Sequence, residues 1–183
     1  TWFSSNTMDL SSQQKKDFEN HIRSGDTNLD SRWKDNFPSQ RASIAIYDLI
    51  DAENVRARSI ASAVDSQNIE YAKTLAKEDA PIKMINELLR LSNIPIEISV
   101  GENDQVVASK CRGSYYSVAE LSDGERNALL IAANVLTVKS GTLVLIDEPE
   151  RHLHRSIISP LLTLLFSKRA DCAFTGSTHD VML

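Results

Sequence analysis

The sequence has few cysteines, no excess of positive charge and no long apolar run. Its two cysteines, Cys111 and Cys172, are too few for a disulfide framework, so we expect a reducing compartment, the cytoplasm. The formal net charge of -5 argues against a chain that coats nucleic acid through bulk positive charge. No apolar run approaches the roughly 20 residues that span a bilayer, so we expect no membrane partner.

The residues that are present give an ordinary globular balance. Hydrophobic residues make up 42% and charged residues 25%, which excludes general disorder. The 183 residues are enough for a domain with a proper core. The chain begins at Thr1 without a signal peptide and stops at Leu183 soon after a motif, so we expect it to be a piece of a larger protein.

The first half of the chain, residues 1–93, reads as a polar lead-in followed by a helical subdomain. A short helix is expected around Gln13–Arg23. Helix formers then dominate from Gln40 to Leu91, where we expect only short helices, one of them with Pro81 in its first turn. Apolar residues at helical spacing predict a core-facing stripe on that helix: Ile82, Ile85, Leu88 and Leu89.

The second half, residues 94–183, begins with a change of period. Apolar residues alternate from Ile94 to Val100, turn residues follow, and Gln105–Ser109 continues the pattern. This spacing predicts a β-hairpin. Four motifs then follow in order.

The first motif is Leu121–Glu125, directly before a helical pattern. A Ser and a Gly at the start of a helix offer backbone N–H groups to an anion, so Ser122 and Gly124 suggest a grip on phosphate. The alternative is a plain N-cap at Ser122 with Glu125 in the first turn.

The second motif is a strongly apolar run, Thr142–Ile146, followed by Asp147 and Glu148. The run predicts a strand buried on both faces, as in a parallel sheet, with two carboxylates at its C-terminal end, where α/β sheets bind ligands. Asp147 suits a Mg²⁺ shell, and Glu148 suits orientation and deprotonation of a water molecule. The alternative is a solvated acidic turn.

Two further motifs contain histidines. Arg151–His154 holds two of them, but a loop without Cys is a poor zinc site, so we expect it to contact a partner subunit. After a helix, roughly Arg155–Phe166, and a strand, Cys172–Thr175, comes Ser177–Asp180. Its His179 follows a strand expected beside the one that carries Asp147, where it would meet a γ-phosphate or a water molecule.

This order resembles the C-terminal half of an ABC-type P-loop NTPase head, an α/β fold with a mostly parallel core sheet flanked by helices. Leu121–Glu125 looks like the signature motif, Leu143–Glu148 like Walker B, Glu150–His154 like the D-loop, and His179 like the switch histidine. The resemblance covers about Tyr115 to Asp180.

The resemblance implies ATP and Mg²⁺ as cofactors and a homodimer or higher oligomer that encloses ATP. Mg²⁺ would lie at Asp147, and Glu148 and His179 would be catalytic. The γ-phosphate of the partner's ATP would be bound by the turn of the signature motif: Ser122, Asp123, Gly124 and Glu125. A P-loop, Gly-x4-Gly-Lys-Ser/Thr, is missing, because none of the six glycines precedes a lysine. We therefore expect this segment to be inactive alone.

The motifs Leu-Ser-Asp-Gly-Glu and Asp-Glu-Pro-Glu-Arg-His-Leu-His are similar to those of the soluble RecF-like, SMC-like and OLD-family heads rather than to transporters. The closest resemblance is to PtuA-type ATPases of Septu and retron antiphage systems. These imply an HNH-type nuclease partner and, in retrons, a reverse transcriptase with msDNA. The alternatives are an OLD-type ATPase-nuclease, a DNA-repair or chromosome-structuring head, and a non-catalytic scaffold that uses ATP only to set its dimer state.

Direct nucleic-acid contact is a separate hypothesis. Three basic clusters suit phosphates, with Trp33 able to stack on a base: Arg32–Lys34, Arg56 with Arg58, and Lys110 with Arg112. Solvated helix faces explain them equally well.

Overall fold

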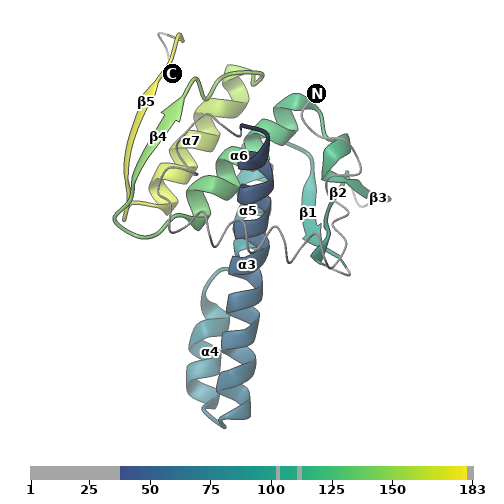
Figure 1. Cartoon of the computed structure of the whole chain (residues 1–183), viewed down its shortest axis with the longest axis vertical. Helices are drawn as coiled ribbons and strands as arrows, with labels where there is room; N and C mark the ends of the chain where they lie inside the picture. Colours follow the sequence, from purple (N-terminus) through teal and green to yellow (C-terminus); the bar gives the residue numbers. More distant parts are fainter. Residues whose placement is uncertain (1–37, 102–103, 111–112, 181–183) are drawn as a thin grey trace.

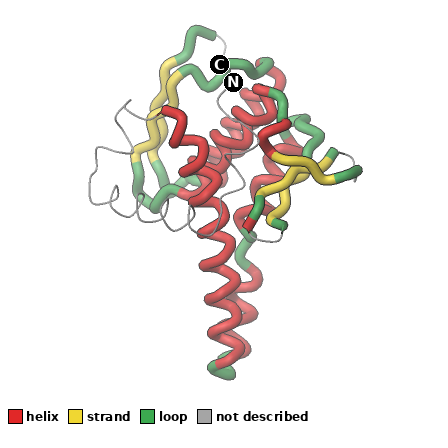
Figure 2. The backbone as a smooth tube through the Cα atoms, turned by 45° about the vertical axis from the view of Figure 1, so that its right-hand side comes forward, coloured by secondary structure: helices red, strands yellow, loops and turns green. Residues whose placement is uncertain are grey.

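The computed structural model describes residues 38–101, 104–110 and 113–180. Its elements, in chain order, are α3 (Pro38–Asp65), α4 (Ile69–Lys77), α5 (Pro81–Leu91), β1 (Glu97–Val100), β2 (Val106–Ser109), β3 (Tyr115–Ser117), the 3-10 helix η3 (Val118–Glu120), α6 (Asp123–Thr137), β4 (Leu143–Asp147), α7 (Arg155–Lys168) and β5 (Ala173–Ser177). The strands of the described residues form two sheets. The sheets lie on opposite sides of a central group of helices, and α3 and α4 project from the body as a helical hairpin (Figures 1 and 2). The helix expected around Gln13–Arg23 lies outside the described residues, and the division near residue 93 stays a prediction.

The helical hairpin corrects the expectation of only short helices between residues 40 and 91. Helix α3 is 28 residues long. Helix α4 starts at an Asn68 cap, whose side chain accepts a hydrogen bond from Tyr71 N at 3.3 Å. Arg56 of α3 caps the C-terminal end of α4, because its Nη2 donates hydrogen bonds to Ala76 O at 3.1 Å and to Glu78 O at 3.0 Å. The sequence pattern did not reveal the length of α3 because polar residues interrupt its apolar stripe.

Helix α5 forms as predicted, with Pro81 in its first turn. The predicted stripe faces the core: Ile85, Leu88 and Leu89 are buried and Ile82 packs against them. The predicted hairpin is also confirmed, because β1 and β2 pair antiparallel with Val100 opposite Val106. Asn86 of α5 fixes this sheet, donating to Ile98 O at 2.8 Å and accepting from Ile98 N at 2.7 Å. The third strand, β3, was not predicted, because three residues are too short for a readable alternation.

The parallel sheet contains β4 and β5, with Leu145 opposite Thr175. Val144 and Ile146 pack against the core. The prediction that this strand is buried on both faces is wrong, because Leu143 and Leu145 are 56% and 64% exposed. A continuous apolar run shows that both faces are apolar, but it does not show whether this chain supplies a cover for both.

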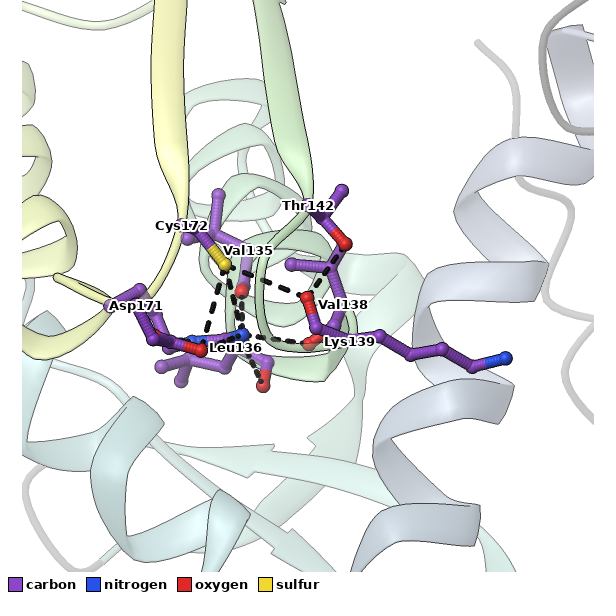
Figure 3. A network of polar contacts seen from close by, with 8 residues as sticks. Val135, Leu136, Val138, Lys139, Thr142, Asp171 and Cys172 are labelled. Carbon is purple, nitrogen blue, oxygen red and sulfur yellow. Dashed lines mark hydrogen bonds and ion pairs between the residues drawn. The ribbon is translucent and has the colours of Figure 1, made fainter.

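The residue that follows α7, Arg169, holds the base of this sheet. Figure 3 labels four of its partners: Val135, Leu136, Val138 and Asp171. The Arg169 guanidinium donates to Val135 O at 2.8 Å, to Leu136 O at 3.0 Å and to Val138 O at 2.8 Å. These carbonyls end α6, where a helix has orphan acceptors and a negative dipole end. Two further bonds of 2.9 Å reach the carboxylate of Asp171. One side chain therefore ties the end of α6 to the turn that leads into β5.

The fold is thus mixed α/β, with a parallel sheet against helices and with a helical segment and a β-hairpin before the signature turn, as predicted for a partial ABC-type head. Among the residues that the structure describes, no helix is both long and apolar enough to cross a membrane.

Candidate functional site

The carboxyl end of the parallel sheet brings the second and fourth motifs together. Asp147 ends β4 and lies opposite Ser177, which ends β5. The Ser177 hydroxyl donates a hydrogen bond to Asp147 Oδ1. The two strand ends therefore present a carboxylate and a hydroxyl side by side at the edge where α/β sheets bind ligands.

Glu148 leaves the strand and takes a different partner. Its backbone has φ 43, a left-handed conformation that is uncommon for a non-glycine residue and often occurs at functional sites. The Glu148 N–H donates to Ser177 O at 3.0 Å, and Glu148 Oε1 lies 2.8 Å from His179 Nε2. The two adjacent acids thus have separate contacts: Asp147 meets β5, and Glu148 meets the loop that follows β5.

Glu150 connects the same two loops. Its Oε1 accepts hydrogen bonds from Thr178 Oγ1 at 2.8 Å and from His179 N at 2.9 Å. The pKa of Glu150 is held below its usual value by its own backbone N–H, by the Thr178 hydroxyl and by the His179 N–H. Sequence reasoning placed Glu150 in the D-loop and did not link it to the histidine.

The signature turn forms a capping box at the start of α6. Ser122 Oγ accepts from Glu125 N at 3.3 Å, and Ser122 N donates to Glu125 Oε2 at 2.9 Å. Lys110, just after β2, lies 2.9 Å from Glu125 Oε1. Burial raises the pKa of Glu125, but the bonds from Lys110 and Ser122 outweigh it and keep this pKa below the usual value. The N-cap alternative therefore describes the local structure, and Lys110 balances the negative charge of Glu125 there.

The segment after Glu148 packs on the signature turn. Asn127 Nδ2 donates to Arg151 O at 2.7 Å. A Cβ at Gly124 would lie only 2.9 Å from His152 O, so this glycine permits the close approach of helix and loop. His154 caps α7, with its Nδ1 accepting from Ser156 N at 3.2 Å. The segment thus has a structural role within this chain, and its expected contact with a partner subunit stays a prediction.

The donor set at the sheet edge fits Mg²⁺, which prefers oxygen ligands and uses one or two carboxylates. Asp147 and Ser177 supply a carboxylate and a hydroxyl. The described residues hold no group of three or more His, Cys, Asp or Glu side chains that could bind a metal. The sequence contains no P-loop motif, since none of its six glycines precedes a lysine.

Three of the six basic candidates for nucleic-acid binding lie in the described residues, and each of these three has another contact there. Arg56 caps α4, Lys110 pairs with Glu125, and Arg58 lies 3.7 Å from Asp51. Arg32–Lys34 and Arg112 lie outside the described residues. Sequence reasoning missed the roles of Lys110, Glu150 and Thr178, since each partner is remote in the chain.

The fold defines an α/β domain whose candidate ligand groups stand at the carboxyl end of a parallel sheet. A family profile described as "AAA domain, putative AbiEii toxin, Type IV TA system" matches residues 3–180. The chain belongs to this family of AAA domains. No curated protein matches it.

Solved structures of Smc heads are similar to parts of the chain. One, an Smc head bound to the C-terminal winged-helix domain of ScpA, is 16% identical, with a TM-score of 0.46, covering 62% of this chain and 39% of that chain. Another, an Smc head with an extended coiled coil bound to the C-terminal domain of ScpA, derived from Pyrococcus furiosus, is 16% identical, with a TM-score of 0.42, covering 93% of this chain and 48% of that chain. The chain spans less than half the length of either.

Proposed function

We propose that this chain supplies one part of an ATP-hydrolysing site in a dimeric ATPase. The observation that carries the proposal is the pair Glu148–His179, 2.8 Å apart beside Asp147 at the carboxyl end of the parallel sheet. Membership of an AAA domain family supports nucleotide as the ligand.

Each side chain has one role in this proposal. Asp147, assisted by the Ser177 hydroxyl, would hold Mg²⁺, which neutralises phosphate charge when bound. Glu148 would orient the attacking water and accept its proton. His179, at hydrogen-bond distance from Glu148, would position that carboxylate and sense the γ-phosphate.

The signature turn would serve the partner's nucleotide. The start of a 15-residue helix favours an anion, and Ser122 and Gly124 lie at that start. Lys110 lies 2.9 Å from Glu125, so its positive charge reduces the electrostatic repulsion between the Glu125 carboxylate and a phosphate. We therefore propose Ser122–Glu125 as the contact to the γ-phosphate across the dimer.

The P-loop would be contributed from outside residues 1–183. The exposed side chains of Leu143 and Leu145 support this, because parallel sheets are normally covered on both faces. We propose that the P-loop part of the head covers this face and extends the sheet.

The finer proposal is a cytoplasmic ATPase that regulates an effector nuclease in antiphage defence, as in PtuA-type systems. Its support is the resemblance of the signature and D-loop motifs, together with a family description that names a toxin–antitoxin system. The α3–α4 hairpin gives weight to the SMC-like alternative, because it places an elongated helical projection before the signature turn. A scaffold that binds ATP without hydrolysing it is the candidate from another class.

The test is ATP turnover by the full-length protein and by its Glu148→Gln variant. Loss of a general base lowers rates by about 10²–10⁴-fold, so kcat should fall by that factor while ATP binding persists. The variant should accumulate as an ATP-dependent dimer in size-exclusion chromatography.

Glu70→Gln is the matched control, because Glu70 is an exposed residue of α4 whose carboxylate pairs with Lys73. It should leave turnover and dimerisation unchanged. ATP-dependent dimerisation without turnover in the unmodified protein would instead support the scaffold. Equal turnover in Glu148→Gln and the unmodified protein would refute the role of Glu148.

A further inference from the structure

Glu150 lies between the turn that follows β4 and the loop that follows β5. The proposed chemistry gives this residue no role. It lies in the turn after β4, and its Oε1 receives the Thr178 hydroxyl at 2.8 Å and the His179 N–H at 2.9 Å. Thr178 Oγ1 in turn accepts from Asp180 N at 3.0 Å. One carboxylate oxygen thus organises consecutive residues of the loop that carries the histidine.

The carboxylate is well suited to this task. Its own backbone N–H and the donors of the loop lower the pKa of Glu150, so it is ionised at neutral pH. Hydrogen bonds to an ionised acceptor are roughly twice as strong as neutral ones. The loop backbone therefore has a firm anchor on the β4 side.

The His179 ring needs such an anchor. Its side chain is 87% exposed, and a polar contact at an exposed side chain does little to hold that side chain in one position. The contact with Glu148 is therefore too weak to fix the ring unless the backbone that bears it is already held in place.

We propose that Glu150 is a positioning residue that fixes the Thr178–His179 backbone so that the His179 ring meets Glu148. Glu150 acts through His179 and does not touch the nucleotide. The expected effect on ATP turnover rests on the proposed function, whereas the expected effect on the position of the His179 ring does not.

The experiment compares Glu150→Ala, Glu150→Gln and Thr178→Ala in the full-length protein. Glutamine keeps a carbonyl oxygen that can accept both bonds, whereas alanine keeps no acceptor. Two readouts are taken: the kcat and KM for ATP, and the ring signals of His179 in a protein with ¹⁵N-labelled histidine.

We expect Glu150→Ala to lower kcat by about 10–100-fold, the cost of a small misplacement of a catalytic group, with the KM for ATP nearly unchanged. The His179 ring signals should shift in the same variant. Glu150→Gln should restore most of both readouts. Thr178→Ala, which removes one donor and leaves the carboxylate, should shift both in the same direction by less, and it keeps the proposal testable if Glu150→Ala does not fold.

Unchanged His179 signals in Glu150→Ala would overturn the proposal, and so would equal loss of kcat in Glu150→Ala and Glu150→Gln. Absence of turnover in the unmodified protein would refute the proposed function instead. The His179 signals then decide the role of Glu150 by themselves, with Glu70→Gln again as the control.

Discussion

Replacement of Gly124 by alanine tests whether the start of α6 packs as closely on the His152–Leu153 segment as the structure shows. An added Cβ would lie 2.9 Å from the carbonyl oxygen of His152 and 3.5 Å from Leu153 Cδ2. The first contact is with backbone, and Leu153 is largely buried, so neither neighbour moves freely.

The expected change in the free energy of unfolding follows from two opposing effects. Overpacking of a well-packed contact costs about 1–3 kcal/mol. Alanine is better than glycine inside a helix by about 0.5–1 kcal/mol, which offsets part of that cost. We expect Gly124→Ala to lower the free energy of unfolding by about 1–2 kcal/mol, which in a chain of this size lowers Tm by about 2–8 °C.

The assay is guanidinium unfolding followed by circular dichroism, with the slope m checked for constancy. Gly101→Ala is the matched control, because a Cβ there would meet Gln105 O at an ordinary 3.7 Å. The control should be neutral or slightly stabilising. A Gly124→Ala protein as stable as the control variant would refute the close approach of α6 and the His152 carbonyl.

Two further predictions concern the Arg169 network. Arg169→Ala should lower the free energy of unfolding by about 1–3 kcal/mol, because it leaves part-buried carbonyls at the end of α6 without their donor. Arg169→Lys should restore only part of this stability, since the planar fork of donors is lost. Lys139→Ala is the control, because the backbone carbonyl of Lys139 joins the network whereas its side chain points away from it (Figure 3). The free energies of unfolding of the three variants are compared by chemical denaturation. Hydrogen bonds from Arg169, aided by Ser140, hold the pKa of Asp171 below its usual value. The ionised Asp171 therefore contributes its full stability above about pH 4, the pKa of this group in the unfolded chain. This contribution declines as the pH falls towards the lower pKa of the folded protein. In unfolding measured between pH 7 and pH 2.5, the stability difference between Asp171→Asn and the unmodified protein should shrink with falling pH; a difference that stays constant would contradict this.

The sequence by itself determined the elements with strong local signals. Pro81 set the start of α5, alternation set the hairpin, and Ser122 with Glu125 set the start of α6. The order of motifs also indicated that the strand bearing Asp147 and the strand before His179 lie together, because strands joined by a helical crossover pair in parallel. These features depend on residues close in the chain or on a regular period.

The tertiary structure alone decided the contacts between remote residues. The bond from His179 N to Glu150, the pairing of Lys110 with Glu125 and the clamp of Arg169 on Val135 join residues 29, 15 and 34 positions apart. The exposure of Leu145 belongs here too, since its sequence pattern is that of a buried strand. Local patterns record which surfaces are apolar and which backbone conformations are favoured. They do not record which surfaces meet, because that depends on the packing of the whole chain.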